Sequence, residues 1–198
     1  MERKSTLGLP DGPWLTGQVL IAMPALADGP FARSVIYMCA HNADGAMGIV
    51  LNQPLASPSF EDLLKTLGVA PLPPARIIRL HSGGPVENGR GFVLHTTDWT
   101  GEGSLRVDGR LALTASLDIL KAIAQGGGPD QGLLALGYSG WGPGQLDREM
   151  QDNAWLSVPL TGDDLGLVFD ADHAGKWQRA LARLGVNPVL LSGTAGHA

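Results

Sequence analysis

Apolar residues recur along the chain in short runs that predict several β-strands. The segment SVIYMCAH at 34–41 is apolar almost throughout, which is typical of a strand covered on both faces. The turn sequence NADG at 42–45 separates it from the apolar AMGIVL, so residues 34–52 are predicted to form a hairpin. Further strands are predicted at 17–23 and 132–138, and two more, at 76–85 and 91–95, lie around a glycine turn.

The clearest local pattern is LRVDGRLAL at 105–113. Apolar residues alternate up to Asp108 and Gly109 and alternate again after them, as in the two strands of a hairpin. Asp-Gly is a favoured pair for a two-residue type I′ turn. We therefore predict such a turn at these two residues.

Two segments in the middle of the chain have the apolar spacing of amphipathic helices. SPSFEDLLKTLG begins at the N-cap Ser59, has Asp62 in the place of the usual Glu or Gln of a capping box, and ends at Gly68. The second predicted helix covers 115–125 and stops at the sequence GGGP.

A third predicted helix, GKWQRALARLG at 175–185, has two different faces. The apolar face, through which the helix should dock, carries Trp177, Ala180, Leu181 and Leu184. The other face carries three basic residues at a spacing that can meet a phosphate backbone, namely Lys176, Arg179 and Arg183. We favour a solvated helix face over a DNA contact.

Hairpins mixed with helices, without a regular βαβ alternation, favour the α+β class. The 198 residues are 44% hydrophobic and suffice for one domain, which we place at 14–198 after a flexible tail at 1–13. A net charge of -5 disfavours nucleic acid as a partner. Neither a signal peptide nor a membrane span is predicted, so we expect a cytoplasmic protein with no membrane contact.

Metal and cofactor chemistry has little support in the residue pattern. The single cysteine, Cys39, excludes an intramolecular disulfide and a multi-thiolate metal site. The histidines show neither H-x-x-x-H nor H-E-x-x-H spacing, so we predict no metal and no cofactor. His41 and His95 can line a polar pocket, but we favour a role for both in hydrogen bonds that tie loops together.

The segment GYSGWGPGQL at 137–146 places a glycine-rich turn ahead of a predicted helix. Free N–H groups at a helix start can bind an anion, but the glycines do not spell G-x-G-x-x-G and no P-loop lysine follows. Ser139 has the nucleophile position of a G-x-S-x-G elbow, whose last glycine is replaced by Trp141. We favour a turn used for packing, with Trp141 as its anchor.

Four segments, in order and across nearly the whole chain from about residue 14, resemble the bacterial YqgE/AlgH family. They are FARSVIYMCAHNADGAMGIVLNQP, GGPVENGRGFVLH, GYSGWGPGQLDREMQDNAWL and the final GHA. The resemblance implies an α+β fold whose bifurcated, mostly antiparallel sheet is partly closed into a small barrel and flanked by helices. It also carries the description of transcriptional regulator, through a link with alginate control, and implies no catalytic residues.

The positions that match family motifs give a candidate surface for a ligand or a partner. They are His41, Asn42, Asn52, Gly83, Gly84, His95, Ser139, Gly140, Trp141, Gly142, Gly144 and Gln145. We predict a cytoplasmic regulator, with an enzymatic role disfavoured, that acts through contact with an unknown protein or small ligand. The alternative is a hydrolase, or a protein that binds a nucleotide or phosphate ligand, with its site in the turn at 137–145.

Overall fold

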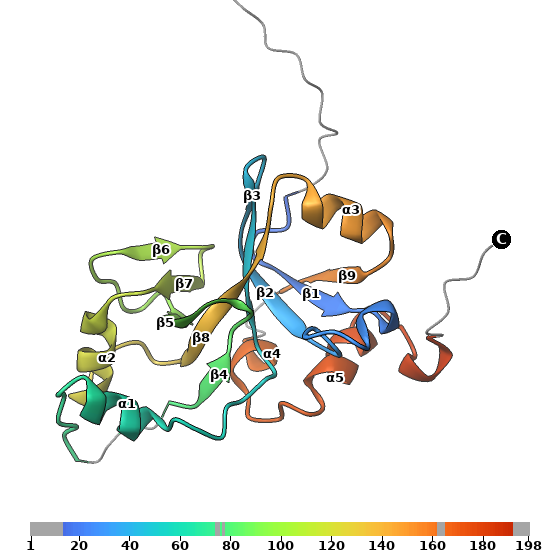
Figure 1. Cartoon of the computed structure of the whole chain (residues 1–198). Coiled ribbons are helices and arrows are strands. Elements are labelled where there is room, and N and C mark those ends of the chain that lie inside the picture. The colour runs from blue at the N-terminus through green and yellow to red at the C-terminus, as the bar shows by residue number, and fades with distance from the viewer. Residues whose placement is uncertain (1–13, 74–75, 77, 162–164, 192–198) are drawn as a thin grey trace, which may run out of the picture.

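The computed structural model describes residues 14–73, 76, 78–161 and 165–191, so the predicted tail and the final GHA lie outside the described residues. The described chain is α+β (Figure 1). Its strands are β1 (Gln18–Ala22), β2 (Val35–Asn42), β3 (Gly45–Val50), β4 (Leu80–Ser82), β5 (Val86–Thr96), β6 (Ser104–Arg106), β7 (Leu111–Thr114), β8 (Gly132–Trp141) and β9 (Trp155–Pro159). Its helices are α1 (Phe60–Thr66), α2 (Leu117–Ala124), α3 (Gln145–Gln151), α4 (Gly166–Phe169) and α5 (Lys176–Ala182), with 3-10 turns at Pro24–Leu26 and Pro188–Leu190.

One sheet contains all of these strands, in the order β6-β7-β5-β8-β3-β2-β1-β9, and β4 pairs with β8 off this path. β8 is the branch point, because β5 occupies one of its edges and the other edge is shared. There, residues 134–136 pair in parallel with β4, and residues 139–141 pair antiparallel with β3. The predicted bifurcated and mostly antiparallel sheet is therefore confirmed.

The sheet curls into a half-barrel, and polar contacts join strands that are far apart in its order. The hydroxyl of Tyr37 on β2 donates to the carboxylate of Asp108 in the β6–β7 turn at 3.1 Å. Arg110 in the same turn donates to the carbonyl of Leu160, just after β9, at 3.0 Å. Burial, and then the nearby Asp108 carboxylate, raise the pKa of Tyr37, so its hydroxyl remains a donor.

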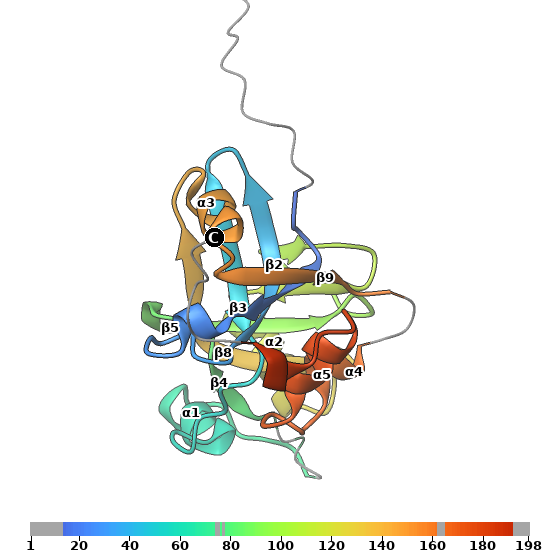
Figure 2. The ribbon, with the colours of Figure 1, turned by 90° about the vertical axis from the view of Figure 1, so that its right-hand side faces the viewer.

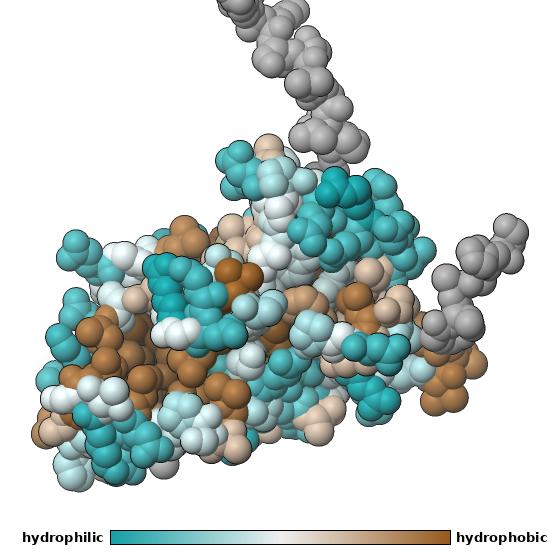
Figure 3. Space-filling view, in the orientation of Figure 1, coloured by the Kyte–Doolittle hydropathy of each residue, from teal (hydrophilic) through white to brown (hydrophobic). Residues whose placement is uncertain are grey.

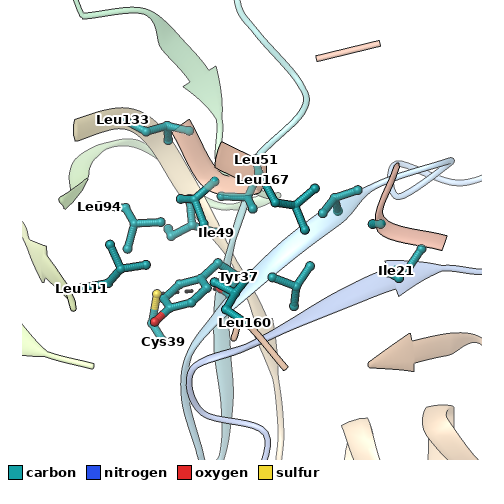
Figure 4. Packing of buried hydrophobic residues seen from close by; sticks show 14 of the residues in the cluster. Ile21, Tyr37, Cys39, Ile49, Leu51, Leu94, Leu111, Leu133, Leu160 and Leu167 are labelled. Atoms are coloured by element: carbon teal, nitrogen blue, oxygen red, sulfur yellow. Dashed lines mark hydrogen bonds between the residues drawn. The ribbon is translucent and has the colours of Figure 1, made fainter. Parts of the chain in front are cut away.

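Apolar side chains from both branches of the sheet fill the space inside this curl. Figure 4 shows residues from β2, β3, β5, β7 and β8 that point toward one another around Tyr37. α4 and α5 cover this cluster through Leu167, Trp177 and Leu181. α1 and α2 pack against β4, β5 and β8 in a second cluster. α3 packs beside β9 in a third cluster (Figures 1 and 2).

Local sequence signals predicted two elements closely. The hairpin at 34–52 is confirmed as β2 and β3. The first helix has the predicted capping box, because the Ser59 hydroxyl accepts from the Asp62 N–H at 3.1 Å and the Asp62 carboxylate accepts from the Ser59 N–H at 3.0 Å. Gly68 follows the helix with a φ of 67°, the left-handed conformation expected after a helix end.

The predicted two-residue type I′ turn at 108–109 is wrong. Such a turn needs positive φ at both central residues, and neither Asp108 nor Gly109 has it. The last regular pair of the ladder is Arg106 with Ala112, so the loop is longer. Asp108 organises it instead, since its carboxylate accepts from the backbone N–H groups of Arg110 and Leu111 at 2.7 and 2.8 Å.

Pairing partners also differ from the simplest interpretation of the apolar runs. β4 and β5 lie on either side of their glycine turn as expected, but they do not pair with each other, because β8 lies between them. β8 itself extends through Trp141, well into the segment that we predicted to be a glycine-rich turn.

The predicted docking of the third helix through Trp177 is confirmed, and its indole N–H donates to the Ala22 carbonyl at 2.8 Å, but Leu184, predicted on the same face, is exposed beyond the end of α5 at Ala182. The expectation of a solvated basic face is wrong at Lys176, which is fully buried. Its ammonium group donates to the Leu167 and Val168 carbonyls at 2.7 and 3.1 Å and lies 3.3 Å from the carboxylate of Asp170. No described helix is long and apolar enough to cross a membrane.

Candidate functional site: a groove between β3, β5 and β8

An open groove of about 630 Å³ lies between the β2–β3 hairpin, the first half of β5 and the β6–β7 strands. Its walls are mainly apolar and include Met47, Phe92, Leu113, Tyr138 and Trp141. Its polar groups are Asn42, Asp44, Glu87 and Arg90. Residues of three of the quoted motifs, which are far apart in the sequence, therefore meet around one cavity.

The first half of β5 departs from a regular strand and forms one rim of the groove. Val86 pairs with Tyr138, but the next pair is Gly91 with Leu136, so the register shifts and residues 87–90 bulge. Glu87 has a φ of 50°, a left-handed conformation that is uncommon outside glycine and often marks functional sites. The strained backbone of the bulge makes this rim a candidate part of a functional site.

Close backbone contacts hold the start of β5 against β8. A Cβ on Gly83 would lie 2.2 Å from the carbonyl oxygen of Gly137, and a Cβ on Gly84 would lie 2.2 Å from the carbonyl carbon of Tyr138. Neither position has room for a side chain. Gly83 and Gly84 thus position the rim through backbone packing and do not line the groove.

Arg90 is the cation among the described residues that line the groove. Its guanidinium lies 5.1 Å from the centre of the Phe92 ring, in a cation–π arrangement, and 3.4 Å from the carboxylate of Glu87. Both members of this ion pair are about half exposed, so the pair contributes little stability. A ligand can therefore displace Glu87 from Arg90 at small cost.

Trp141 is a groove-lining residue that also belongs to a buried cluster with Glu149 and Trp155, here called the Trp–Glu cluster. The indole N–H groups of Trp141 and Trp155 both donate to the same carboxylate oxygen of Glu149, at 2.9 and 2.8 Å. The two indoles pack edge to face with their centres 5.9 Å apart. This cluster fixes α3 to the ends of β8 and β9.

The turn between β8 and α3 is closed by its own side chains. The side-chain oxygen of Gln145 accepts from the Gly142 N–H at 3.0 Å, and its amide group donates to Glu149 at 2.9 Å. Gly144 is the N-cap of α3 with a φ of 64°. The backbone N–H of Gly142 is thus satisfied within the protein. The helix that follows, α3, has only seven residues.

Ser139 lies inside β8 and is fully buried. Its hydroxyl donates to the carbonyl of Gly83 at 3.3 Å. Gly140, the next residue, is exposed and lines the groove. A strand interior is a different geometry from the sharp strand-to-helix turn of a nucleophile elbow.

His41 and Asn52 each tie neighbouring segments together. His41 accepts from the Leu15 N–H through Nδ1 at 3.2 Å, so its Nε2 carries the proton and faces the Asp147 carboxylate at 3.6 Å. The Asn52 side chain accepts from the Val35 N–H and donates to the Arg33 carbonyl, both at 2.9 Å. Both side chains lie outside the groove lining.

His95 is fully buried on β5 and is not among the residues that line the groove. Its Nδ1 donates to the Thr96 carbonyl at 2.8 Å, and its Nε2 accepts from the Thr114 hydroxyl at 2.8 Å. That hydroxyl is 2.7 Å from the hydroxyl of Ser104. Burial lowers the pKa of His95, which favours the neutral ring that this hydrogen-bonded chain needs.

Three of the twelve candidate positions, Asn42, Gly140 and Trp141, line the groove. The other nine lie in the ties, backbone contacts and turn described above. Sequence reasoning did not single out Glu87, Arg90 or Tyr138, although all three lie within the quoted motifs.

Elsewhere, hydrophobic surface gathers over α1 and α2 (Figure 3), where a smaller cavity of about 260 Å³ is lined by Leu63, Leu117 and Leu136.

The fold and the groove define a class of protein: a curled α+β fold with a forked sheet and an open cavity at the branch strand. Within that class the chain belongs to the AlgH-like family, whose model matches residues 19–189. A UPF0301 protein of Rhodospirillum rubrum is 53% identical over 185 residues, which cover 93% of this chain and 95% of that protein. A UPF0301 protein of Gluconobacter oxydans is 52% identical over 186 residues, covering 93% and 98%.

Solved structures agree with this assignment. The solution structure of the AlgH protein from Pseudomonas aeruginosa is 43% identical, with a TM-score of 0.74 over 97% of this chain and all of that one. A crystal structure of a protein from Corynebacterium diphtheriae is 22% identical, with a TM-score of 0.64 over 92% of this chain and 90% of that one, and shows the same fold. The predicted family is confirmed.

Proposed function

We propose that this protein is a non-enzymatic, cytoplasmic regulator that acts by binding a small ligand in the groove. The observation that carries the proposal is the lining, which combines an apolar cavity of about 630 Å³ with a few polar groups, as small-molecule sites do. None of the described residues that line it is Ser, Cys, Thr, Lys or His. Those side chains supply most enzymatic nucleophiles, so the lining supports binding over nucleophilic catalysis.

The lining also favours one class of ligand. Phe92 and Tyr138 form an edge-to-face pair with centres 5.6 Å apart, which suits a flat, largely apolar body. Arg90 suits an acidic group, because a guanidinium binds a carboxylate through paired hydrogen bonds. Asp44 and Glu87 line the same groove and repel a polyanion. We therefore propose a flat ligand with a single negative charge, such as an aromatic monocarboxylate.

A thermal-shift screen tests this proposal. Untagged full-length protein is mixed with aromatic monocarboxylic acids and with the matching neutral amides. A ligand present at 100 times its Kd should stabilise the fold by about 2.7 kcal/mol. We expect acids to raise the unfolding temperature and amides to have little effect.

Two variants locate the site. Arg90→Gln removes the cation of the groove and should abolish the preference for acids. Arg106→Gln is the matched control, because Arg106 is exposed on β6 and lies outside the lining. The proposal is refuted if no acid stabilises the protein, or if Arg90→Gln binds acids as well as Arg106→Gln does.

Among the described residues, no specific contact favours a nucleotide, a hydrolase reaction or direct DNA binding. The glycine-rich turn is closed by Gln145, and Ser139 is buried against Gly83. In the basic set, Lys176 is buried and Arg179 binds the Asp170 carboxylate through two nitrogens. A regulatory effect is therefore proposed to run through a ligand or a protein partner.

A further inference from the structure

Two histidines outside the groove lining face each other beside β4. Nε2 of His81, on β4, lies 3.4 Å from Nδ1 of His173, in the loop between α4 and α5. The rings meet edge to face with centres 4.8 Å apart. His81 is buried and His173 is half-buried, and both line a cavity of about 300 Å³ together with Asp170.

The backbone partner of His81 fixes which of its ring nitrogens carries a lone pair. Nδ1 of His81 lies 3.2 Å from the Arg79 carbonyl, which can only accept, so Nε2 of His81 presents a lone pair to His173. When the N–H of a neutral His173 ring lies on Nε2, its Nδ1 presents a second lone pair to the same gap. Two lone pairs then face each other, and a cation between the rings satisfies both.

The separation of the two nitrogens fits a metal ion. Metal–nitrogen bonds of about 2.0–2.1 Å at a tetrahedral angle place two imidazole nitrogens roughly 3.3–3.4 Å apart. We propose that His81 and His173 are two ligands of a binding site for a divalent transition metal ion such as Zn²⁺ or Co²⁺. Imidazole suits such ions, whereas Mg²⁺ and Ca²⁺ prefer oxygen.

The remaining coordination positions open into the cavity. No group of three or more His, Cys, Asp or Glu in the described residues is arranged to hold a metal, so water or an incoming ligand completes the site. The Asp170 carboxylate lines the cavity but is engaged by Lys176 and Arg179. This leaves an exchangeable position, as in metal sites that bind ligands.

The surroundings discourage a second proton. Burial, Lys176 and Arg79 lower the pKa values of both histidines, and the charge of His173 also lowers that of His81, while the Arg79 backbone acts in the opposite direction on His81 and Asp170 does so on His173. The pKa of His81 falls to about 4. The same positive charges oppose a metal ion, but two lone pairs form bonds to a metal that offset part of that repulsion.

Titration of the untagged, full-length protein with Co²⁺ tests the proposal, because tetrahedral Co²⁺–nitrogen sites absorb visible light. We expect a saturable signal with one Co²⁺ per chain that Zn²⁺ abolishes. Loss of even an outer-shell partner costs roughly 10–100-fold in metal affinity, so His173→Gln should weaken binding at least as much.

His41→Gln is the matched control, because it removes a histidine outside the pair. It should bind Co²⁺ like the wild type. Unfolding curves without metal establish that each variant folds, and the half-buried position of His173 makes its replacement well tolerated. The proposal is overturned if the wild type gives no saturable signal, or if folded His173→Gln binds Co²⁺ as tightly as the His41→Gln control.

Discussion

Removal of the Glu149 carboxylate should destabilise the protein strongly, although Glu149 is only partly buried. In Glu149→Ala, the indole N–H groups of Trp141 and Trp155 both lose their acceptor while their rings stay buried. A hydrogen bond to a charged group contributes roughly 1.5–3 kcal/mol. Partial access of water to the vacated space recovers some of this, so we expect a loss of about 3 kcal/mol in the free energy of unfolding.

Urea unfolding with linear extrapolation measures this change. Glu149→Gln keeps one oxygen that can accept from both indoles but sets its amide group against that of Gln145, so about 1–2 kcal/mol should be lost. Glu61→Gln is the control, because Glu61 forms only an exposed pair with Lys65 and should change stability by under about 0.5 kcal/mol. A loss below about 1 kcal/mol in Glu149→Ala would refute the reasoning that the Trp–Glu cluster holds α3 in place.

Three further predictions concern single residues. Trp141→Ala should cost roughly 3–5 kcal/mol, as truncation of a buried aromatic residue does, and an unchanged urea midpoint would contradict its role as a packing anchor. Tyr37→Phe should cost about 1–2 kcal/mol, since it removes the contact with Asp108 that links β2 to the β6–β7 turn; an equal midpoint to the wild type would show that this contact adds no stability. His81 has a pKa of about 4 in the folded protein and about 6.5 when unfolded, so the unfolded chain binds its proton first. In metal-free protein, the stability that the neutral His81 contributes is fully present above pH 6.5. It is lost as the pH falls toward 4, by up to roughly 3 kcal/mol. His81→Asn should flatten that part of the pH profile, and a profile that keeps its slope would contradict the assignment.

The elements that sequence predicted well are those whose signals are local. The capping box at Ser59 and the hairpin at 34–52 need only neighbouring residues to specify them. β8 differs, because its continuation through Gly140 depends on pairing with β3, a strand about 90 residues earlier by the register of Met47 with Gly140. β9 and the four-residue α4 were not predicted, since short elements carry too few residues for a clear period.

The groove was predictable only in part, for a related reason. Its lining residues Asn42 and Trp141 stand in recognisable motifs. Arg90 and Glu87 lie on a bulge that exists because β5 shifts register against β8, and no local pattern shows such a shift. Likewise, the burial of Lys176 depends on the free carbonyls at the end of α4, a helix without a sequence signal.

The glycine-rich motif and the groove are connected through Trp141. One part of its indole lines the groove, and its N–H is held by Glu149, which also binds Trp155 and Gln145. A side chain fixed in this way loses little further freedom when a ligand packs against it. Binding energy is then not spent on ordering that wall, which favours affinity. In the proposed function, the motif therefore supports ligand binding, because it holds one wall of the proposed site rigid.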